Sequence, residues 1–197
     1  MKNIWDERFA TPEYIYGTLP NSFFKQFIDT VKSGTLLLPA EGEGRNALYA
    51  LQKGWNVTAV DYSVEGRNKA LKLARSNGFN LNYVVADLAG WDTVLEVDSI
   101  ALLYAHFPPE TRLNIHIKLA SMLLPGGKLL IEAFSKHQLQ FDSGGPRNSE
   151  MLYSAEILGQ DFAGLEIEYL EELVIELDEG GFHQGQAAVV RMIANKK

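Results

Sequence analysis

The sequence feature that most constrains the fold is a regular alternation of short apolar runs with amphipathic segments. Such runs occupy residues 35–38, 56–60, 81–86, 99–104 and 128–133. The run at 35–38 in particular is typical of a strand that is buried on both faces. Strands that alternate with helices predict a mainly parallel sheet with helices on both of its faces.

The segments between the apolar runs carry helix signals. Asn21 or Ser22 can cap a helix to residue 32, and Ser63 can cap one to residue 76. Further helices are expected over 46–53, from Thr111 onward and over 149–158. In the helix from Thr111, the apolar face is expected to contain Leu113 and Ile117, with His116 on the surface.

The end of the chain has a different pattern. Two further strands are expected at 168–177 and 186–194, and the segment between them, DEGGFHQG, has the composition of a hairpin turn. The expected fold is therefore an α/β, Rossmann-like, seven-stranded and mainly parallel sheet that ends in an antiparallel hairpin. At 197 residues the chain fits one domain, 1–197, with residues 1–20 as an N-terminal segment.

Composition excludes several classes of function. The chain has no cysteine, which excludes disulfides and thiolate chemistry, and its four histidines lack the spacing of metal ligands, so no metal is expected. A net charge of −7 disfavours nucleic-acid partners. No apolar stretch approaches the roughly 20 residues of a membrane span. We therefore expect a cytoplasmic monomer or homodimer that binds a small-molecule substrate, with no membrane partner.

Polar residues follow the predicted strands at the points where they end. The loop LLLPAEGEGRN (residues 36–46) follows the first strand, and Asp61, Asp87 and Tyr104 with His106 follow later ones. In open parallel sheets, ligands bind outside the carboxyl ends of the strands. The sequence thus predicts one ligand site at this edge.

The loop itself narrows the choice of ligand. Residues 42–47 fit the pattern G-x-G-x-x-A of dinucleotide-binding folds, with Asp61 as the acidic residue further along. However, Glu41 and Glu43 would repel a pyrophosphate, and the chain has no second glycine-rich turn. S-adenosylmethionine has no phosphate, and its ammonium can pair with a carboxylate. A nicotinamide-dependent oxidoreductase and a non-catalytic S-adenosylmethionine-binding regulator remain the alternatives.

The order of these motifs resembles that of class I S-adenosylmethionine-dependent methyltransferases, most closely the branch of tellurite-resistance and thiopurine methyltransferase-like proteins. The resemblance rests on WDERFATPEYIYGTLPN, LLLPAEGEGRN, VTAVDYS, VVADL, ALLYAHFPPETR and LLPGGKLLIEAF, in that order. It spans nearly the whole chain and implies an enzyme that transfers a methyl group from S-adenosylmethionine.

The resemblance implies roles for individual residues. The cofactor-binding residues would be Glu41, Gly42, Glu43, Gly44, Asn46, Asp61, Tyr62, Asp87, Leu88 and Tyr104. Asp61 would bind the ribose and Asp87 the adenine. The family's pattern D-x-G-x-G-x-G places its acidic residue on Leu38 and its first glycine on Ala40. An apolar Leu38 cannot bind an ammonium, so this role falls to Glu41 or Glu43, with Glu43 preferred.

The remaining predictions concern the substrate. Residues 1–20 are expected to form a lid, with Trp5, Phe9, Tyr14, Tyr16 and Arg45 beside the substrate. His106 is the candidate general base near the site of transfer. Because no catalytic dyad is evident, the acceptor is expected to be a thiol, a chalcogen anion, or a small amine or carboxylate.

Overall fold

The computed structural model describes residues 2–197, and the chain divides into two compact units. The first unit contains the chain up to Asp92 together with Glu179–Phe182, and the second contains Thr93–Asp178 and His183–Lys197. We describe each unit by itself. No helix within residues 2–197 is both long enough and apolar enough to cross a membrane.

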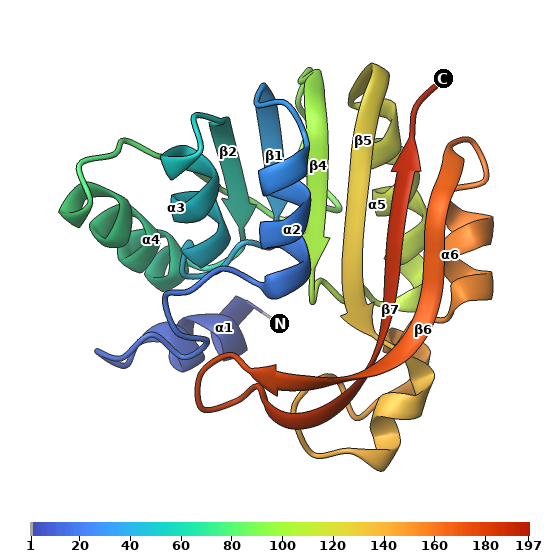
Figure 1. The fold of residues 1–197 in the computed structure, drawn as a ribbon. Helices are drawn as coiled ribbons and strands as arrows, with labels where there is room; N and C mark the ends of the chain where they lie inside the picture. The colour runs from blue at the N-terminus through green and yellow to red at the C-terminus, as the bar shows by residue number, and fades with distance from the viewer. Residues whose placement is uncertain (1) are drawn as a thin grey trace. The chain divides into compact units, whose positions relative to one another are not determined.

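The first unit contains three parallel strands in the order β3-β2-β1, with helices packed against them (Figure 1). Its elements are α1 (Lys2–Phe9), α2 (Ser22–Thr30), β1 (Thr35–Pro39), α3 (Arg45–Gln52), β2 (Asn56–Asp61), α4 (Val64–Ser76) and β3 (Asn82–Val85). Both predicted caps are confirmed: Asn21 accepts a hydrogen bond from the Phe24 amide, and Ser63 accepts one from the Gly66 amide. Helix α1 was not predicted.

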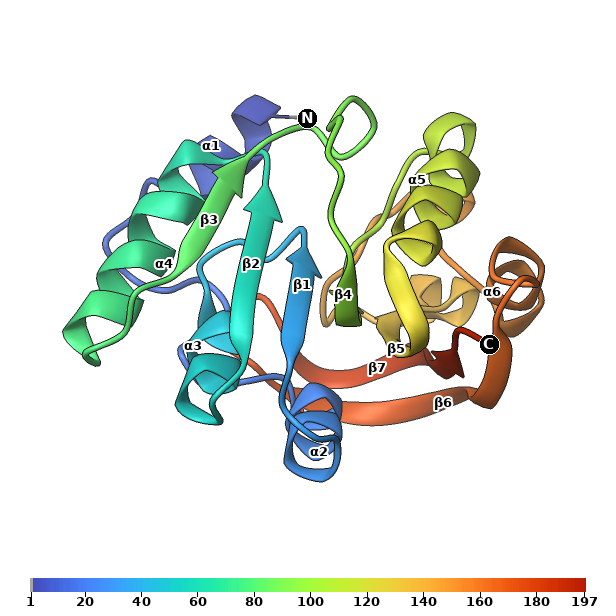
Figure 2. The ribbon, with the colours of Figure 1, turned by 90° about the horizontal axis from the view of Figure 1, so that it is seen from above.

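The second unit contains four strands in the order β4-β5-β7-β6. Strand β5 pairs in parallel with β4 and antiparallel with β7, which pairs antiparallel with β6. The elements are β4 (Val97–Leu103), α5 (Pro109–Ser121), β5 (Leu123–Phe134), η1 (Lys136–Gln140), η2 (Ser149–Met151), α6 (Ala155–Asp161), β6 (Glu166–Asp178) and β7 (Gln184–Asn195). The predicted fold, with seven strands, mainly parallel pairing and a C-terminal hairpin, is confirmed (Figure 2).

Two predicted elements differ in the structure. The helix expected over 149–158 is divided into η2 and α6, because Ser154 caps a new helix through the Ile157 amide. The turn expected at Pro125 lies within β5, where the pairing with β4 is irregular between Val97 and Ser99. These differences leave the strand order unaffected.

The prediction for the buried face of α5 was wrong. Leu113 and Ile117 are 46% and 54% exposed, whereas His116 is fully buried together with Ile115 and Leu119. The His116 ring is buried because its Nδ1 lies 2.8 Å from the Asp161 Oδ2, and it stacks on Phe162. A polar ring with a carboxylate partner thus occupies the position that an apolar side chain was expected to take.

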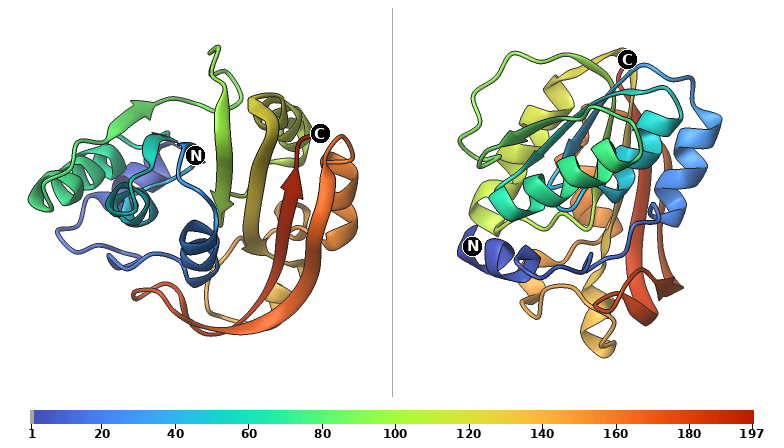
Figure 3. Two further views of the ribbon diagram at one scale, coloured as in Figure 1. Left: turned by 45° about the horizontal axis from the view of Figure 1, so that its top comes forward. Right: turned by 90° about the vertical axis from the view of Figure 1, so that its left-hand side faces the viewer.

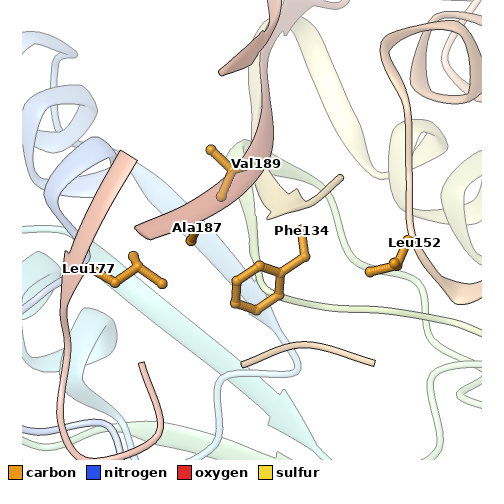
Figure 4. Close-up of a cluster of buried hydrophobic side chains, with 5 residues drawn as sticks. All are labelled: Phe134, Leu152, Leu177, Ala187 and Val189. Atoms are coloured by element: carbon orange, nitrogen blue, oxygen red, sulfur yellow. The ribbon is translucent and has the colours of Figure 1, made fainter. Parts of the chain in front are cut away.

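The core of the second unit includes a cluster at the end of β5. Five buried side chains make up this cluster, which Figure 4 shows: Phe134, Leu152, Leu177, Ala187 and Val189. Tyr104 packs against the same cluster from the residue after β4. The polar groups that follow β4 and β5 therefore stand on a rigid apolar base.

Candidate functional site

The loop after β1 has a backbone that only small residues can follow. Gly42 and Gly44 have φ angles of 64° and 87°, in the left-handed region. A Cβ on Gly44 would lie 2.6 Å from the Cβ of Ala70, and one on Gly42 would lie 3.2 Å from the Phe9 ring. Ala40 is also left-handed, with φ 56°, although it has a side chain. Ala40, where the family's pattern has its first glycine, therefore has the left-handed backbone that is typical of glycine.

Glu41 is a buried carboxylate that has no cationic partner among the ion pairs of side chains in residues 4–197. Its Oε1 accepts a hydrogen bond of 2.7 Å from the Ala47 amide, and its Oε2 lies 3.5 Å from the Asn46 Nδ2. Burial raises the pKa of Glu41 to about 7, and these hydrogen bonds and the charge of Arg45 oppose the shift only in part. A ligand cation would complete the surroundings of this carboxylate.

Glu43, two residues later, is already paired. Its Oε1 lies 2.6 Å from the Lys69 Nζ, and its Oε2 accepts the Ile15 amide at 2.8 Å and the Tyr16 amide at 3.4 Å. Its side chain is only 3% exposed. Glu43 therefore fastens the N-terminal segment and α4 to the loop, and its charge is balanced by Lys69.

Asp61, at the end of β2, accepts hydrogen bonds from backbone amides of two loops, the one after β1 and the one after β2. One carboxylate oxygen accepts the Gly42 amide at 3.0 Å, and the other accepts the Ser63 amide at 2.9 Å. Burial raises the pKa of Asp61, while these amides oppose the shift. The Tyr62 amide also donates to this carboxylate. Because each carboxylate oxygen can accept two hydrogen bonds, the three amides do not use all of its acceptor capacity, and a ligand hydroxyl could still bind.

The residues after β2 and β3 also lie near one another. The Tyr62 hydroxyl hydrogen-bonds to the Asp87 carboxylate, and burial together with Asp87 raises the pKa of Tyr62 to about 12. Asp87 is exposed and accepts the Ala89 amide at 2.9 Å, while Leu88 is buried. The site thus offers a phenol ring and a carboxylate near a buried leucine.

The N-terminal segment (residues 2–20) lies on the loop and on α4. Trp5 and Phe9 stack with ring centroids 5.5 Å apart, and Phe9 is buried beside Gly42 and Gly66. Asp6 accepts a 2.6 Å hydrogen bond from the Ser63 hydroxyl, and the Tyr14 hydroxyl donates to the Lys69 carbonyl at 3.1 Å. The segment is therefore ordered by packing and by hydrogen bonds.

Arg45 and Asn46 hold this segment from the start of α3. The Arg45 guanidinium donates to the Tyr16 carbonyl at 3.3 Å and pairs with Glu179 at 2.7 Å. The Asn46 Oδ1 accepts the Asn21 amide at 2.9 Å. Both side chains are buried, and both bind backbone groups of the N-terminal segment or of the residue that follows it.

In the second unit, Tyr104 follows β4 in a left-handed conformation with φ 53°. Its hydroxyl donates to Glu132 at 2.7 Å, and Glu132 is fully buried and paired with Arg191 at 2.5 Å. The His183 ring lies edge-on to the Tyr104 ring, with centroids 4.6 Å apart. A non-glycine residue with positive φ is uncommon and is found at functional sites, because surrounding contacts must hold it there.

Both ring nitrogens of His106 are occupied. The Nδ1 lies 2.7 Å from the Met151 carbonyl oxygen, and the Nε2 accepts the Phe134 amide at 3.2 Å. The proton of the neutral ring is therefore on Nδ1. Burial lowers the pKa of His106 to about 4. In this structure the ring is a neutral support for the backbone at the end of β5.

The first unit brings together most of the predicted cofactor residues, from Glu41 to Asp87. Tyr104 and His106 belong to the other unit. Sequence reasoning missed several residues that hold the site, namely Asp6, Lys69, Tyr83 and Glu179. Tyr83, for example, donates from its hydroxyl to the Gly42 carbonyl at 2.6 Å. Local patterns carry no signal for such partners, because they lie on distant parts of the chain.

Comparison with known proteins places this loop in context. Residues 39–127 match a family described as a methyltransferase domain. The matched stretch begins at the last residue of β1 and includes the glycine loop, Asp61 and Asp87. No curated protein matches the chain in sequence.

Several solved structures share the fold. One, described with the conversion of a disulfide bond into a thioacetal group during echinomycin biosynthesis, has a TM-score of 0.82 at 17% identity, over 100% of this chain and 92% of that one. TehB from Haemophilus influenzae has a TM-score of 0.75 at 17% identity, over 100% and 67%. The N-methyltransferase NodS from Bradyrhizobium japonicum, bound to S-adenosylhomocysteine, has a TM-score of 0.72 at 11% identity, over 99% and 97%.

At these identities the structural likeness shows the fold, and the family match shows the kind of domain. The matched residues include the glycine loop and Asp61, which accepts the Gly42 amide. Residues 39–127, a little under half of the chain, are thus similar to a methyltransferase domain, and the whole chain shares its fold with solved methyltransferases.

Proposed function

We propose that this protein transfers the methyl group of S-adenosylmethionine to a small-molecule acceptor. The observation that carries the proposal is the glycine loop after β1, where Asp61 holds Gly42 and Glu41 lies buried without a cationic partner, inside the stretch that matches a methyltransferase domain. Bound S-adenosylmethionine would supply an electrophilic methyl group: a bond from the acceptor to the methyl carbon would form in line as the carbon–sulfur bond breaks and S-adenosylhomocysteine leaves as a thioether.

Glu41 is the better candidate for the ammonium of the cofactor, in place of the initially preferred Glu43. Lys69 already neutralises Glu43, and a second cation would have to compete with that pair. Glu41 has no such partner, and its desolvation makes pairing with a cation favourable. The pairing would also restore the charge that burial disfavours.

The other cofactor contacts follow from the free acceptor positions. Asp61 would bind the ribose hydroxyls with the acceptor capacity that its backbone donors leave. Asp87 would accept from the adenine amino group, with Tyr62 and Leu88 against the adenine ring. A carboxylate here suits adenine, because its amino group is a donor.

The N-terminal segment would act as a lid over the cofactor. Phe9 lies against Gly42, and the amides of Ile15 and Tyr16 are bound by Glu43 on the same loop. A lid of this kind excludes water from the reacting sulfonium and fixes the two reactants in line. Well-oriented reactants can gain roughly 7–11 kcal/mol from positioning alone.

The acceptor would need no general base from His106. With both ring nitrogens bonded to backbone and a lowered pKa, this side chain has no free basic nitrogen in the structure. An acceptor that is already ionised or strongly nucleophilic at pH 7 fits this arrangement. A thiol, a chalcogen anion, or a small amine or carboxylate meets the requirement.

Acceptors that present a sulfur atom should be tested first. The structural neighbour from echinomycin biosynthesis is described with sulfur chemistry, and the likeness to TehB agrees with the proposed tellurite-resistance and thiopurine branch. Amines should be tested as acceptors too, because the structural neighbour NodS is an N-methyltransferase. The net charge of −7 disfavours a nucleic-acid acceptor. We propose a single domain over the whole chain that acts in the cytoplasm as a monomer or homodimer.

The experiment is a panel of acceptors scored by the release of S-adenosylhomocysteine, with calorimetry of S-adenosylhomocysteine and NADH alongside. Turnover with a small thiol or chalcogen anion, and no competition by NADH, is the expected result. Tight binding of NADH with no response to S-adenosylhomocysteine would instead support an oxidoreductase. Binding without turnover on any acceptor would support a regulatory protein. Turnover on a transfer RNA or a protein alone would refute the small-molecule acceptor.

A substitution of His106 can distinguish a role as general base from a role in holding the backbone at the end of β5. Because the ring is neutral and fully bonded, His106→Asn should change the rate by the same factor from pH 6 to pH 9. A rate that falls in wild type with an apparent pKa near 6 or 7, and loses that step in the variant, would show that His106 does transfer a proton.

A further inference from the structure

The turn between β6 and β7 lies against the N-terminal segment. This turn, Glu179–Phe182, belongs to the first unit, although the two strands that it joins belong to the second. Figures 1 and 3 show the turn beside the part of the chain that follows α1. We call these four residues the hairpin turn.

Glu179 makes the strongest contacts of the hairpin turn. Its Oε2 pairs with the Arg45 Nη2 at 2.7 Å, and its Oε1 accepts the Asn21 Nδ2 at 3.0 Å. The Arg45 and Glu179 side chains are only 9% and 11% exposed, so water screens this pair weakly. Arg45 also donates to the Tyr16 and Leu19 carbonyls, at 3.3 and 3.5 Å. One guanidinium therefore joins the hairpin turn to the segment.

Two further contacts support the same junction. Gly180 has a φ of 74°, and a Cβ there would collide with the Ile15 carbonyl oxygen and lie 2.8 Å from the Gly17 amide nitrogen. The Arg8 guanidinium lies 5.5 Å from the centre of the Phe182 ring, and it also donates to the Tyr16 hydroxyl at 3.0 Å. The close backbone approach at Gly180 is possible only for glycine.

We propose that Glu179 is a positioning residue, and that the hairpin turn is a latch that keeps the N-terminal segment closed over the glycine loop. The proposal rests on the lid role proposed above. Arg45 is the first residue of α3 and follows Gly44 directly, so it connects the latch to the cofactor loop. Cofactor exchange requires the segment to move away from Gly42, and the latch must open first.

The first test needs no ligand and compares two neighbouring glycines. Gly180→Ala should displace Ile15 and Gly17, whereas Gly181→Ala meets no atom within 4 Å and serves as the control. Opening of the segment exposes Tyr14 and Tyr16 to chymotrypsin, and cleavage of a transiently open segment follows its population. We expect Gly180→Ala to be cut there roughly tenfold to a hundredfold faster, the range that the cost of a forced steric contact gives.

The second test measures cofactor exchange. Glu179→Gln keeps the shape of the side chain and removes the charge that binds Arg45, so S-adenosylhomocysteine should dissociate roughly tenfold faster or more. The KM for S-adenosylmethionine should rise by a larger factor than kcat changes. Glu179→Asp keeps the charge and should recover part of the effect. Glu176→Gln, on the exposed part of β6, is the matched control and should behave as wild type.

The two tests separate failure of the latch from failure of the proposed function. Equal cleavage of Gly180→Ala, Gly181→Ala and wild type would overturn the latch, whether or not the protein binds S-adenosylhomocysteine. Faster cleavage of folded Glu179→Gln, with an unchanged dissociation rate, would overturn its positioning role for the cofactor. If wild type binds no S-adenosylhomocysteine, the proposed function fails, and the cleavage rates still decide the latch.

Discussion

Replacement of Glu41 by Gln should stabilise the protein above pH 7. The carboxylate is buried without a cation, and its pKa is about 7 against 4.5 in an unfolded chain. Since a tenfold change in acidity corresponds to 1.36 kcal/mol, the charged form costs up to about 3 kcal/mol at high pH. That is a large share of a typical unfolding free energy of roughly 5–15 kcal/mol. Gln can still accept the 2.7 Å hydrogen bond from the Ala47 amide.

The pH dependence has a defined sign. Because folding raises the pKa of Glu41, the folded state binds more protons than the unfolded state between pH 4.5 and about 7. Stability from this group is therefore complete below pH 4.5 and is lost as the pH rises through about 7. Urea unfolding of wild type and Glu41→Gln at pH 5, 6, 7 and 8 measures the difference. The gain of the variant should be smallest at pH 5 and largest at pH 8.

The pH dependence of ligand affinity should also report the ionisation of Glu41. If the ammonium of the ligand pairs with ionised Glu41, binding requires loss of the proton, so wild type should bind S-adenosylhomocysteine about tenfold more weakly at pH 6 than at pH 8. Glu41→Gln should bind weakly and lose this dependence, and any titration of the ligand itself appears equally in both proteins. Glu43→Gln, which loses the pair with Lys69, should keep the dependence.

Two results would refute this reasoning. An unchanged pH dependence of stability in Glu41→Gln would show that Glu41 is ionised in the folded state at pH 5, against the effect of burial. If Glu41→Gln binds S-adenosylhomocysteine with normal affinity and only Glu43→Gln loses affinity, then Glu43 is the residue that binds the ammonium.

Three other outcomes are expected. Gly44→Ala combines backbone strain with a collision against α4 and should cost about 2–5 kcal/mol of unfolding free energy by urea denaturation, whereas Gly54→Ala has strain alone and should cost about 1–2 kcal/mol; equal costs would contradict the close approach. Asp61→Ala should weaken S-adenosylhomocysteine binding by about 1–3 kcal/mol in calorimetry, and an unchanged affinity would remove it from the ribose site. Deletion of residues 1–20 should abolish turnover while circular dichroism still shows the α/β fold, and retained turnover would exclude a lid.

The fold was predictable because its signals are local. Residues such as Asn21 and Ser63 cap helices within three residues of themselves, and both caps are present. The apolar runs needed no partner to be recognised, since a strand buried on both faces has few polar positions. The C-terminal hairpin was predictable for the same reason: the composition between its strands is that of a turn.

Helix α5 shows where local signals fail. Its apolar residues Leu113 and Ile117 have the spacing of a buried face, yet they are exposed. His116 is buried because Asp161, 45 residues away, accepts its Nδ1 hydrogen, and burial lowers the pKa of the ring. A periodicity argument counts apolar side chains and has no way to include a distant carboxylate. The result is a helix rotated by about one residue from its expected position.

The glycine loop shows the same limit at the candidate site. Glu41 and Glu43 are equivalent in the sequence, since each is an acidic residue next to a glycine. Their environments differ because Lys69, on α4, reaches Glu43 and leaves Glu41 alone. A buried charge needs either a partner in the fold or a partner that arrives with a ligand. Glu43 has a partner in the fold, Lys69, and it holds the N-terminal segment through the Ile15 and Tyr16 amides. Glu41 has no such partner among the described side chains, which is why we propose that a ligand cation completes its surroundings.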